Sequence, residues 1–265
     1  MPRSTTRGQN WTHEQLKLAF HLYCQLPFGK LHKANPEIVE LAKLIGRTPS
    51  ALAMKLVNFA SLDPVIIDSG RTGLRGASAA DRAIWSEFHN AWESLALECA
   101  DLKERLRERL QMPARTDEDE EQFELPETFE GETRVALREY RIKQGFFRRA
   151  VLSTYNNRCC MSGLAEKRLL VASHIVPWSV DKANRLNPAN GLSLSAIHDR
   201  AFDKGLITVL PDFTIGVSPA LSKYKTNDVV AALFELHGRP IALPKRFRPS
   251  ESLLRFHNER IFVRR

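Results

Sequence analysis

The chain has 265 residues, enough for one large domain or two medium ones, and its formal net charge of +8 suits a polyanionic partner such as nucleic acid. It contains no run of eighteen apolar residues, and its basic, polar N-terminus lacks the apolar stretch of a signal peptide, so we expect a cytoplasmic protein that does not cross a membrane. The four cysteines form no spaced pattern, which argues against a disulfide framework and for a reducing compartment.

Apolar residues at helical spacing predict an all-helical N-terminal domain over residues 1–112. Within it, residues 40–59 have the order of a helix-turn-helix. Gly46 suits the left-handed end of a first helix, and Thr48 or Ser50 can cap a second helix with Pro49 in its first turn. Together with Trp11 and Tyr23, this segment resembles Myb-like three-helix domains.

A helix beginning near Ser50 could read DNA in the major groove. Ser50, Lys55 and Asn58 would face the bases, and Arg47 would contact phosphate. The alternative is a pair of helices that only pack on each other; the charge of the chain favours DNA contact.

A long helix is predicted from Ser78 to about residue 110, because Ser78 and Asp81 have the spacing of a capping box and apolar residues follow at helical intervals. Its apolar face either packs in the core or forms a homodimer contact. Residues 113–134 come next, with nine acidic and two basic residues, and are predicted to be a linker. The linker is either a solvated spacer or an acidic strip that occupies the DNA groove when no substrate is bound.

The remaining part, residues 135–265, begins with a basic amphipathic helix over residues 141–155. Arg141, Arg148 and Arg149 are its candidate contacts to backbone phosphate. Further on, residues 206–210 and 213–217 are predicted to be two short strands joined by a Pro-Asp turn.

A His…Asn…His series lies between these elements. His174 ends an apolar strand in A-S-H-I-V-P-W, Asn190 follows in N-P-A-N-G-L-S-L, and His198 lies in the first turn of a helix, I-H-D-R-A-F-D, that Ser195 caps and Gly205 ends. The series resembles the catalytic core of HNH endonucleases, in particular a branch of restriction proteins. The resemblance implies an α+β fold with a C-terminal ββα-metal nuclease domain.

The resemblance also implies roles for the three residues. A histidine can deprotonate water at neutral pH, which makes His174 the expected general base. By similarity His198 is a ligand of one Mg2+ or Mn2+ ion, and Asn190 braces the loop. No structural zinc is expected, because the chain has no C-x-x-C pairs. His237 and His257 are expected to be structural.

One position departs from the family pattern. Many HNH proteins have Asp or His directly before the first His as a further metal ligand, and this chain has Ser173 there. Asp203 is the candidate replacement, although it lies about 140° from His198 around a regular helix and shares a face with Asp199 instead.

We therefore expect a metal-dependent DNA endonuclease of the restriction type that acts on double-stranded DNA. Two alternatives stay open: a catalytically inactive DNA-binding regulator, and a nonspecific or RNA-directed nuclease.

Overall fold

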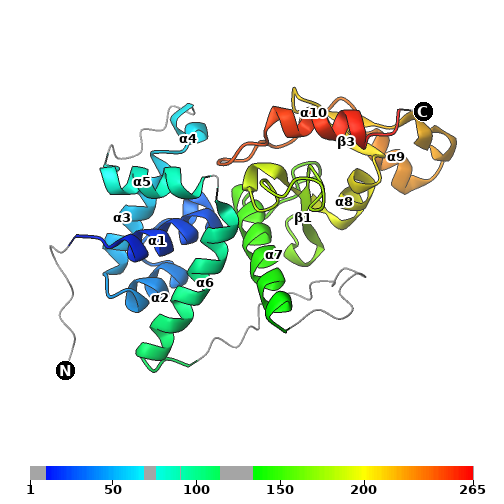
Figure 1. The fold of residues 1–265 in the computed structure, drawn as a ribbon. Helices are drawn as coiled ribbons and strands as arrows, with labels where there is room; N and C mark the ends of the chain where they lie inside the picture. The colour runs from blue at the N-terminus through cyan, green and yellow to red at the C-terminus, as the bar shows by residue number, and fades with distance from the viewer. Residues whose placement is uncertain (1–9, 69–75, 90, 114–133, 265) are drawn as a thin grey trace. The chain divides into compact units, whose positions relative to one another are not determined.

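The computed structural model describes residues 10–68, 76–89, 91–113 and 134–264 (Figure 1). Its contacts divide the chain into two compact units, Met1–Arg149 and Ala150–Arg265. The first is helical and the second contains small antiparallel sheets, so the fold is α+β, as predicted. Most of the predicted acidic linker lies outside the described residues.

The helices of the N-terminal unit are α1 (His13–Gln25), α2 (Pro36–Leu44), α3 (Pro49–Ala60), α4 (Pro64–Asp68), α5 (Ala79–Phe88), α6 (Trp92–Arg109) and the first part of α7 (Arg134–Thr154). The start of α7 belongs to this unit because Arg138 pairs with Asp101 and Glu104, and Lys143 pairs with Glu93. The unit boundary therefore falls inside α7, whereas the sequence predicts a domain that begins at residue 135.

The predicted turn between α2 and α3 is confirmed. Gly46 has a φ of 69°, and the Thr48 hydroxyl, not that of Ser50, accepts a hydrogen bond from the Ala51 amide at 3.2 Å. Assignment of this pair to a helix-turn-helix or Myb-like class stays a prediction.

The prediction of a single long helix from Ser78 is wrong. The capping box of Ser78 and Asp81 forms, but α5 ends at Phe88 and α6 starts at Trp92. The rings of Trp85 and Trp92 both lie within 6.0 Å of the Phe20 ring. One tryptophan from each of the two helices therefore packs on the same phenylalanine of α1.

The C-terminal unit is built around a ββα arrangement. Strands β1 (Leu170–His174) and β2 (Gly191–Ser195) pair antiparallel, with His174 opposite Gly191, and α8 (Ala196–Asp203) follows directly. The remaining elements are β3 (Ile207–Val209), β4 (Ile215–Val217), α9 (Asp228–Phe234) and α10 (Glu251–Arg260). The predicted hairpin of β3 and β4 is confirmed.

The predicted bounds of α8 are also confirmed. The Ser195 hydroxyl accepts a hydrogen bond from the His198 amide, and Gly205 just beyond the helix has a φ of 66°. A side chain at Gly205 would clash with the carbonyl oxygen of Ile261, so the end of α8 lies directly against the chain that follows α10. Caps and close packing thus fix α8 at both ends.

Candidate active site

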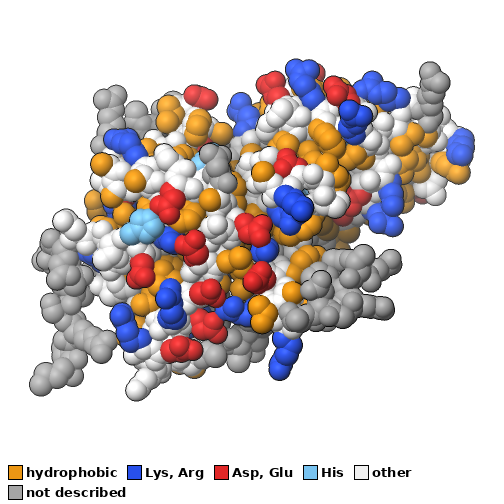
Figure 2. All heavy atoms as spheres, viewed as in Figure 1, with side chains coloured by type: hydrophobic (Ala, Val, Ile, Leu, Met, Phe, Trp, Pro, Cys, Tyr) orange, Lys and Arg blue, Asp and Glu red, His pale blue; other side chains and the backbone are white. Residues whose placement is uncertain are grey.

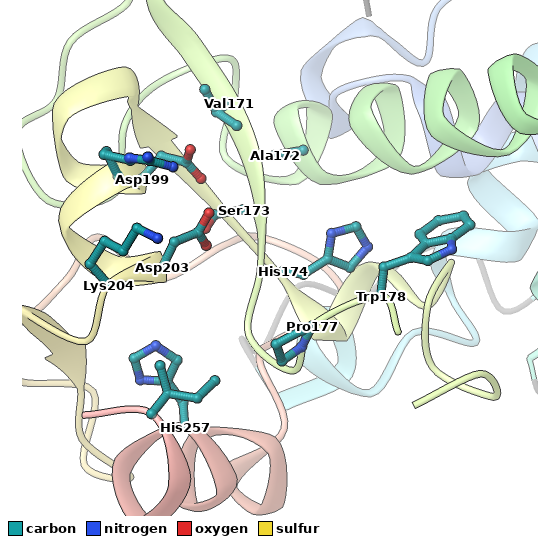
Figure 3. A pocket seen from close by; sticks show the side chains of 12 residues that line it. Val171, Ala172, Ser173, His174, Pro177, Trp178, Asp199, Asp203, Lys204 and His257 are labelled. Carbon is teal, nitrogen blue, oxygen red and sulfur yellow. The ribbon is translucent and has the colours of Figure 1, made fainter. Parts of the chain in front are cut away.

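A cavity of about 440 Å³ opens between β1, α8 and α10 in the C-terminal unit (Figure 3). It is lined by Val171, Ala172, Ser173, His174, Pro177, Trp178, Asp199, Arg200, Asp203, Lys204, His257 and Ile261. His174 and the carboxylates of Asp199 and Asp203 therefore share one cavity.

His174 is held in one orientation at the end of β1. Its Nε2 donates a hydrogen bond to the Arg185 carbonyl oxygen at 2.9 Å, and its ring meets the Trp178 ring nearly at right angles. A carbonyl oxygen can only accept, so Nε2 carries the proton and Nδ1 carries the lone pair of the neutral ring. Burial lowers the pKa of His174 to about 4, although the bond to the carbonyl opposes this shift. The imidazole is therefore neutral and able to accept a proton at pH 7.

Asn190 is fully buried and closes the loop that follows His174. Its Oδ1 accepts from the Val176 amide at 2.9 Å, and its Nδ2 donates to the carbonyl oxygens of Val176 and Asn184. The side chain does not line the cavity, so its contribution is to the conformation of the loop that carries Trp178 and Arg185.

Asp199 and Asp203 lie one helical turn apart on the cavity side of α8, the shared face that the sequence spacing predicts. Figure 3 shows both carboxylates directed toward Ser173. Partial desolvation and the nearby charge of Asp199 raise the pKa of Asp203 to about 6, and desolvation also raises the pKa of Asp199. A divalent cation between them would relieve this repulsion.

His198, the predicted metal ligand, does not line the cavity. Its Nδ1 lies 2.9 Å from the Ser195 hydroxyl and 3.4 Å from Cys159 Sγ. Burial of Cys159 opposes ionisation, but its hydrogen bonds with His198 and Ser162 outweigh that effect and lower its pKa to about 6. The structure thus brings His174 together with Asp203 and turns His198 toward Cys159, a residue that no sequence motif marks.

Two basic side chains, Arg200 and Lys204, line the cavity beside the carboxylates. Within the described parts of the chain neither makes a side-chain hydrogen bond or ion pair, even though Asp199 and Asp203 are neighbours on the same helix. The C-terminal unit contains 17 Lys and Arg against 9 Asp and Glu over residues 150–265, so it carries a net charge of +8. The surroundings of the cavity therefore favour an anionic ligand.

The predicted DNA contacts of the N-terminal unit divide into exposed and engaged side chains. Ser50 is exposed and Asn58 is half-buried on α3. Lys55 is 8% exposed, and its ammonium lies 2.7 Å from the carboxylate of the fully buried Asp81. Arg47 donates to Gln15 and to the Asn10 carbonyl and covers the Trp11 ring. The structure therefore places Lys55 in the core, where it cannot face a base.

The three arginines of α7 also belong to the N-terminal unit. Arg149 pairs with Glu37 of α2, Arg141 is exposed, and desolvation lowers the pKa of Arg148. On the face drawn in Figure 2, Asp and Glu side chains gather over this unit among the basic ones. The strongest preference for an anion thus comes from the C-terminal unit.

No three His, Cys, Asp or Glu side chains among the described residues converge closely enough to hold a metal ion by themselves. None of the helices in the described part of the chain is long and apolar enough to span a bilayer.

Residues 159–210 match the model of the HNH endonuclease family. The matched segment contains β1, β2, α8 and β3, and with them all of the cavity residues except His257 and Ile261. No curated protein matches the chain. The match places this segment in the HNH family and supports a nuclease that acts on DNA.

Proposed function

We propose that the HNH segment makes this protein a divalent-metal-dependent DNA endonuclease in which His174 is the general base. One observation carries the proposal: a neutral imidazole, fixed in one tautomer by the Arg185 carbonyl, faces the same cavity as two carboxylates. Hydrolysis of a phosphodiester requires a base for the attacking water, and Nδ1 of His174 is the nitrogen that would receive the proton.

Asp199 and Asp203 are the residues that would hold the metal ion, with Asp199 taking the place predicted for His198. Mg2+ commonly binds through one or two carboxylates, water and substrate phosphate, so a pair of carboxylates fits without a third protein ligand. The Ser173 hydroxyl supports this fit. It is 2% exposed and lines the cavity, and it lies near enough to Asp199 to lower the pKa of that carboxyl group. Among the described residues it makes no hydrogen bond of good geometry. The bound ion would stabilise negative charge on the phosphate and the leaving oxygen.

Arg200 and Lys204 would bind the phosphate backbone next to the scissile bond. Two carboxylates and two cations leave the cavity wall with no net charge, so the site gains positive charge only when a divalent ion binds. This balance supports binding of the DNA phosphate after, or together with, the metal ion.

The N-terminal unit remains the candidate for sequence recognition in a restriction enzyme, through Ser50 and Asn58 on α3. These two side chains are neutral and polar, which suits base contacts better than phosphate contacts. A homodimer, which would place two nuclease centres on two strands, also stays a proposal.

The test is cleavage of supercoiled plasmid with Mg2+ or Mn2+, with and without a chelator. His174→Ala should lower the rate by about 10²–10⁴-fold while DNA binding persists. His237→Ala, at an exposed histidine of the same unit, is the matched control and should cleave normally. Undiminished cleavage by His174→Ala would remove His174 as the base, and faster cleavage of RNA than of DNA would favour the RNA-directed alternative.

A further inference from the structure

His257, on α10, lies well beyond the matched segment and yet lines the same cavity as His174 and Asp203 (Figure 3). It is 1% exposed and lies in the last helix that the structure describes. The cavity is therefore completed by a segment that the family match does not include.

Both ring nitrogens of His257 are already engaged. Nε2 donates to the Phe202 carbonyl oxygen at 3.1 Å, so Nδ1 is the acceptor for the Thr208 hydroxyl at 2.9 Å. The ring also stacks on the Phe202 ring, with centroids 3.7 Å apart and planes 15° from parallel. These contacts leave no nitrogen for a metal ion or for substrate, so His257 acts on its neighbours and not on the reacting groups.

The Phe202 carbonyl belongs to the peptide that joins Phe202 to Asp203. That oxygen also accepts a hydrogen bond from the Gly205 amide at 2.8 Å, where α8 ends. His257 thus fixes both the ring and the peptide immediately before Asp203. A shift of this peptide would change the spacing between the Asp203 and Asp199 carboxylates, on which binding of one cation depends.

We propose that His257 is a positioning residue for the Asp199 and Asp203 pair. Through His257, α10 then holds the two carboxylates of the nuclease site at the spacing that binds a cation. This inference rests on the proposed function, because it takes the two carboxylates as the metal ligands. In this inference, α10 contributes to metal affinity as well as to the stability of the C-terminal unit.

Asn258 provides a matched control on the same helix. It is also buried, and its Nδ2 anchors α10 through hydrogen bonds to the Val209 and Leu254 carbonyl oxygens. It contacts neither α8 nor the cavity in these bonds. Asn258→Ala should therefore lower stability and keep the contacts between His257 and Phe202, whereas His257→Phe keeps an aromatic ring on Phe202 and loses both hydrogen bonds.

The experiment is titration of the full-length protein with Mn2+ by calorimetry, together with hydrogen exchange of α8. We expect His257→Phe to raise the Kd for Mn2+ about tenfold and to speed exchange at the end of α8. His257→Gln, which restores a donor for the Phe202 carbonyl, should recover part of the affinity, and Asn258→Ala should melt at a lower temperature with its Mn2+ Kd unchanged.

Two results would overturn the inference, and they are distinguishable. If the wild type and Asp203→Asn both fail to bind Mn2+, the metal site of the proposed function is absent and its positioning residue with it. If the wild type binds Mn2+ and His257→Phe binds equally well, or no worse than Asn258→Ala, the proposed metal site stands and His257 is structural only.

Discussion

The neutral state of His174 can be tested without substrate or metal, through the pH dependence of stability. An unfolded histidine has a pKa near 6.5, while burial lowers the pKa of folded His174, and that of His257, to about 4. Between these values the unfolded chain binds more protons than the folded one. Stability contributed by the neutral rings is therefore present above about pH 6.5 and is lost as the pH falls toward 4.

The size of the loss follows from the two pKa values. Lowering the pH from 7 to 5 should cost about 2 kcal/mol for each buried ring, or about 4 kcal/mol for both. His174→Gln retains an amide N–H for the Arg185 carbonyl and removes one titrating group, so its loss over the same interval should be smaller by about 2 kcal/mol.

Hydrogen exchange in increasing urea, read from peptides of β2 and α8 and corrected for the intrinsic exchange rate, measures unfolding of the C-terminal unit at each pH. Carboxylates contribute to the wild type and the variant alike and cancel in the difference. Asn258→Ala is the control, because it should lower stability equally at both pH values. An acid dependence in His174→Gln identical to that of the wild type would show that folded His174 titrates near 6.5, and would refute its assignment as a preformed neutral base.

Three further predictions concern charged groups. Since the pKa of Asp203 is about 6, protons compete with the metal ion for this carboxylate below that pH. The Kd for Mn2+, measured by calorimetry, should therefore rise about tenfold as the pH is lowered from 7.5 to 5, and Asp203→Asn should largely lose this dependence. Replacing Arg200 and Lys204 with Gln should each lower the slope of log DNA affinity against log salt by about 1, measured by fluorescence anisotropy, while Arg239→Gln, at an exposed arginine outside the cavity, should not. Lys55→Ala should destabilise the N-terminal unit in urea by roughly 3–5 kcal/mol by leaving its buried carboxylate partner uncompensated; a soluble, equally stable variant with weakened DNA binding would contradict this.

Local chemistry made much of the fold predictable. Ser195 and Gly205 mark the ends of α8, and Gly46 and Thr48 mark the turn between α2 and α3, because caps and left-handed residues act through the adjacent backbone. The helical period alone placed Asp199 and Asp203 on one face.

Contacts between distant segments were not predictable in the same way. The burial of Lys55 depends on Asp81, and the tryptophans of α5 and α6 pack on a phenylalanine of α1. His198 has the family spacing, but which way its ring points depends on Cys159, which lies 39 residues earlier. The spacing of residues in the sequence could identify these side chains as candidates. Tertiary packing decides which of them face the cavity.

The close approach at Gly205 sets a limit on how this nuclease can be divided or exchanged. Its carbonyl oxygen accepts a hydrogen bond from the Val263 amide, and the Ser218 hydroxyl donates to the Val263 carbonyl. A fragment that ends at Leu210 would retain every residue of the matched segment and lose the chain that packs against the end of α8. The smallest segment that could be transferred with its site intact therefore extends to Val263. A graft of the HNH motif alone onto another protein would transfer the sequence without the contacts that fix the end of α8.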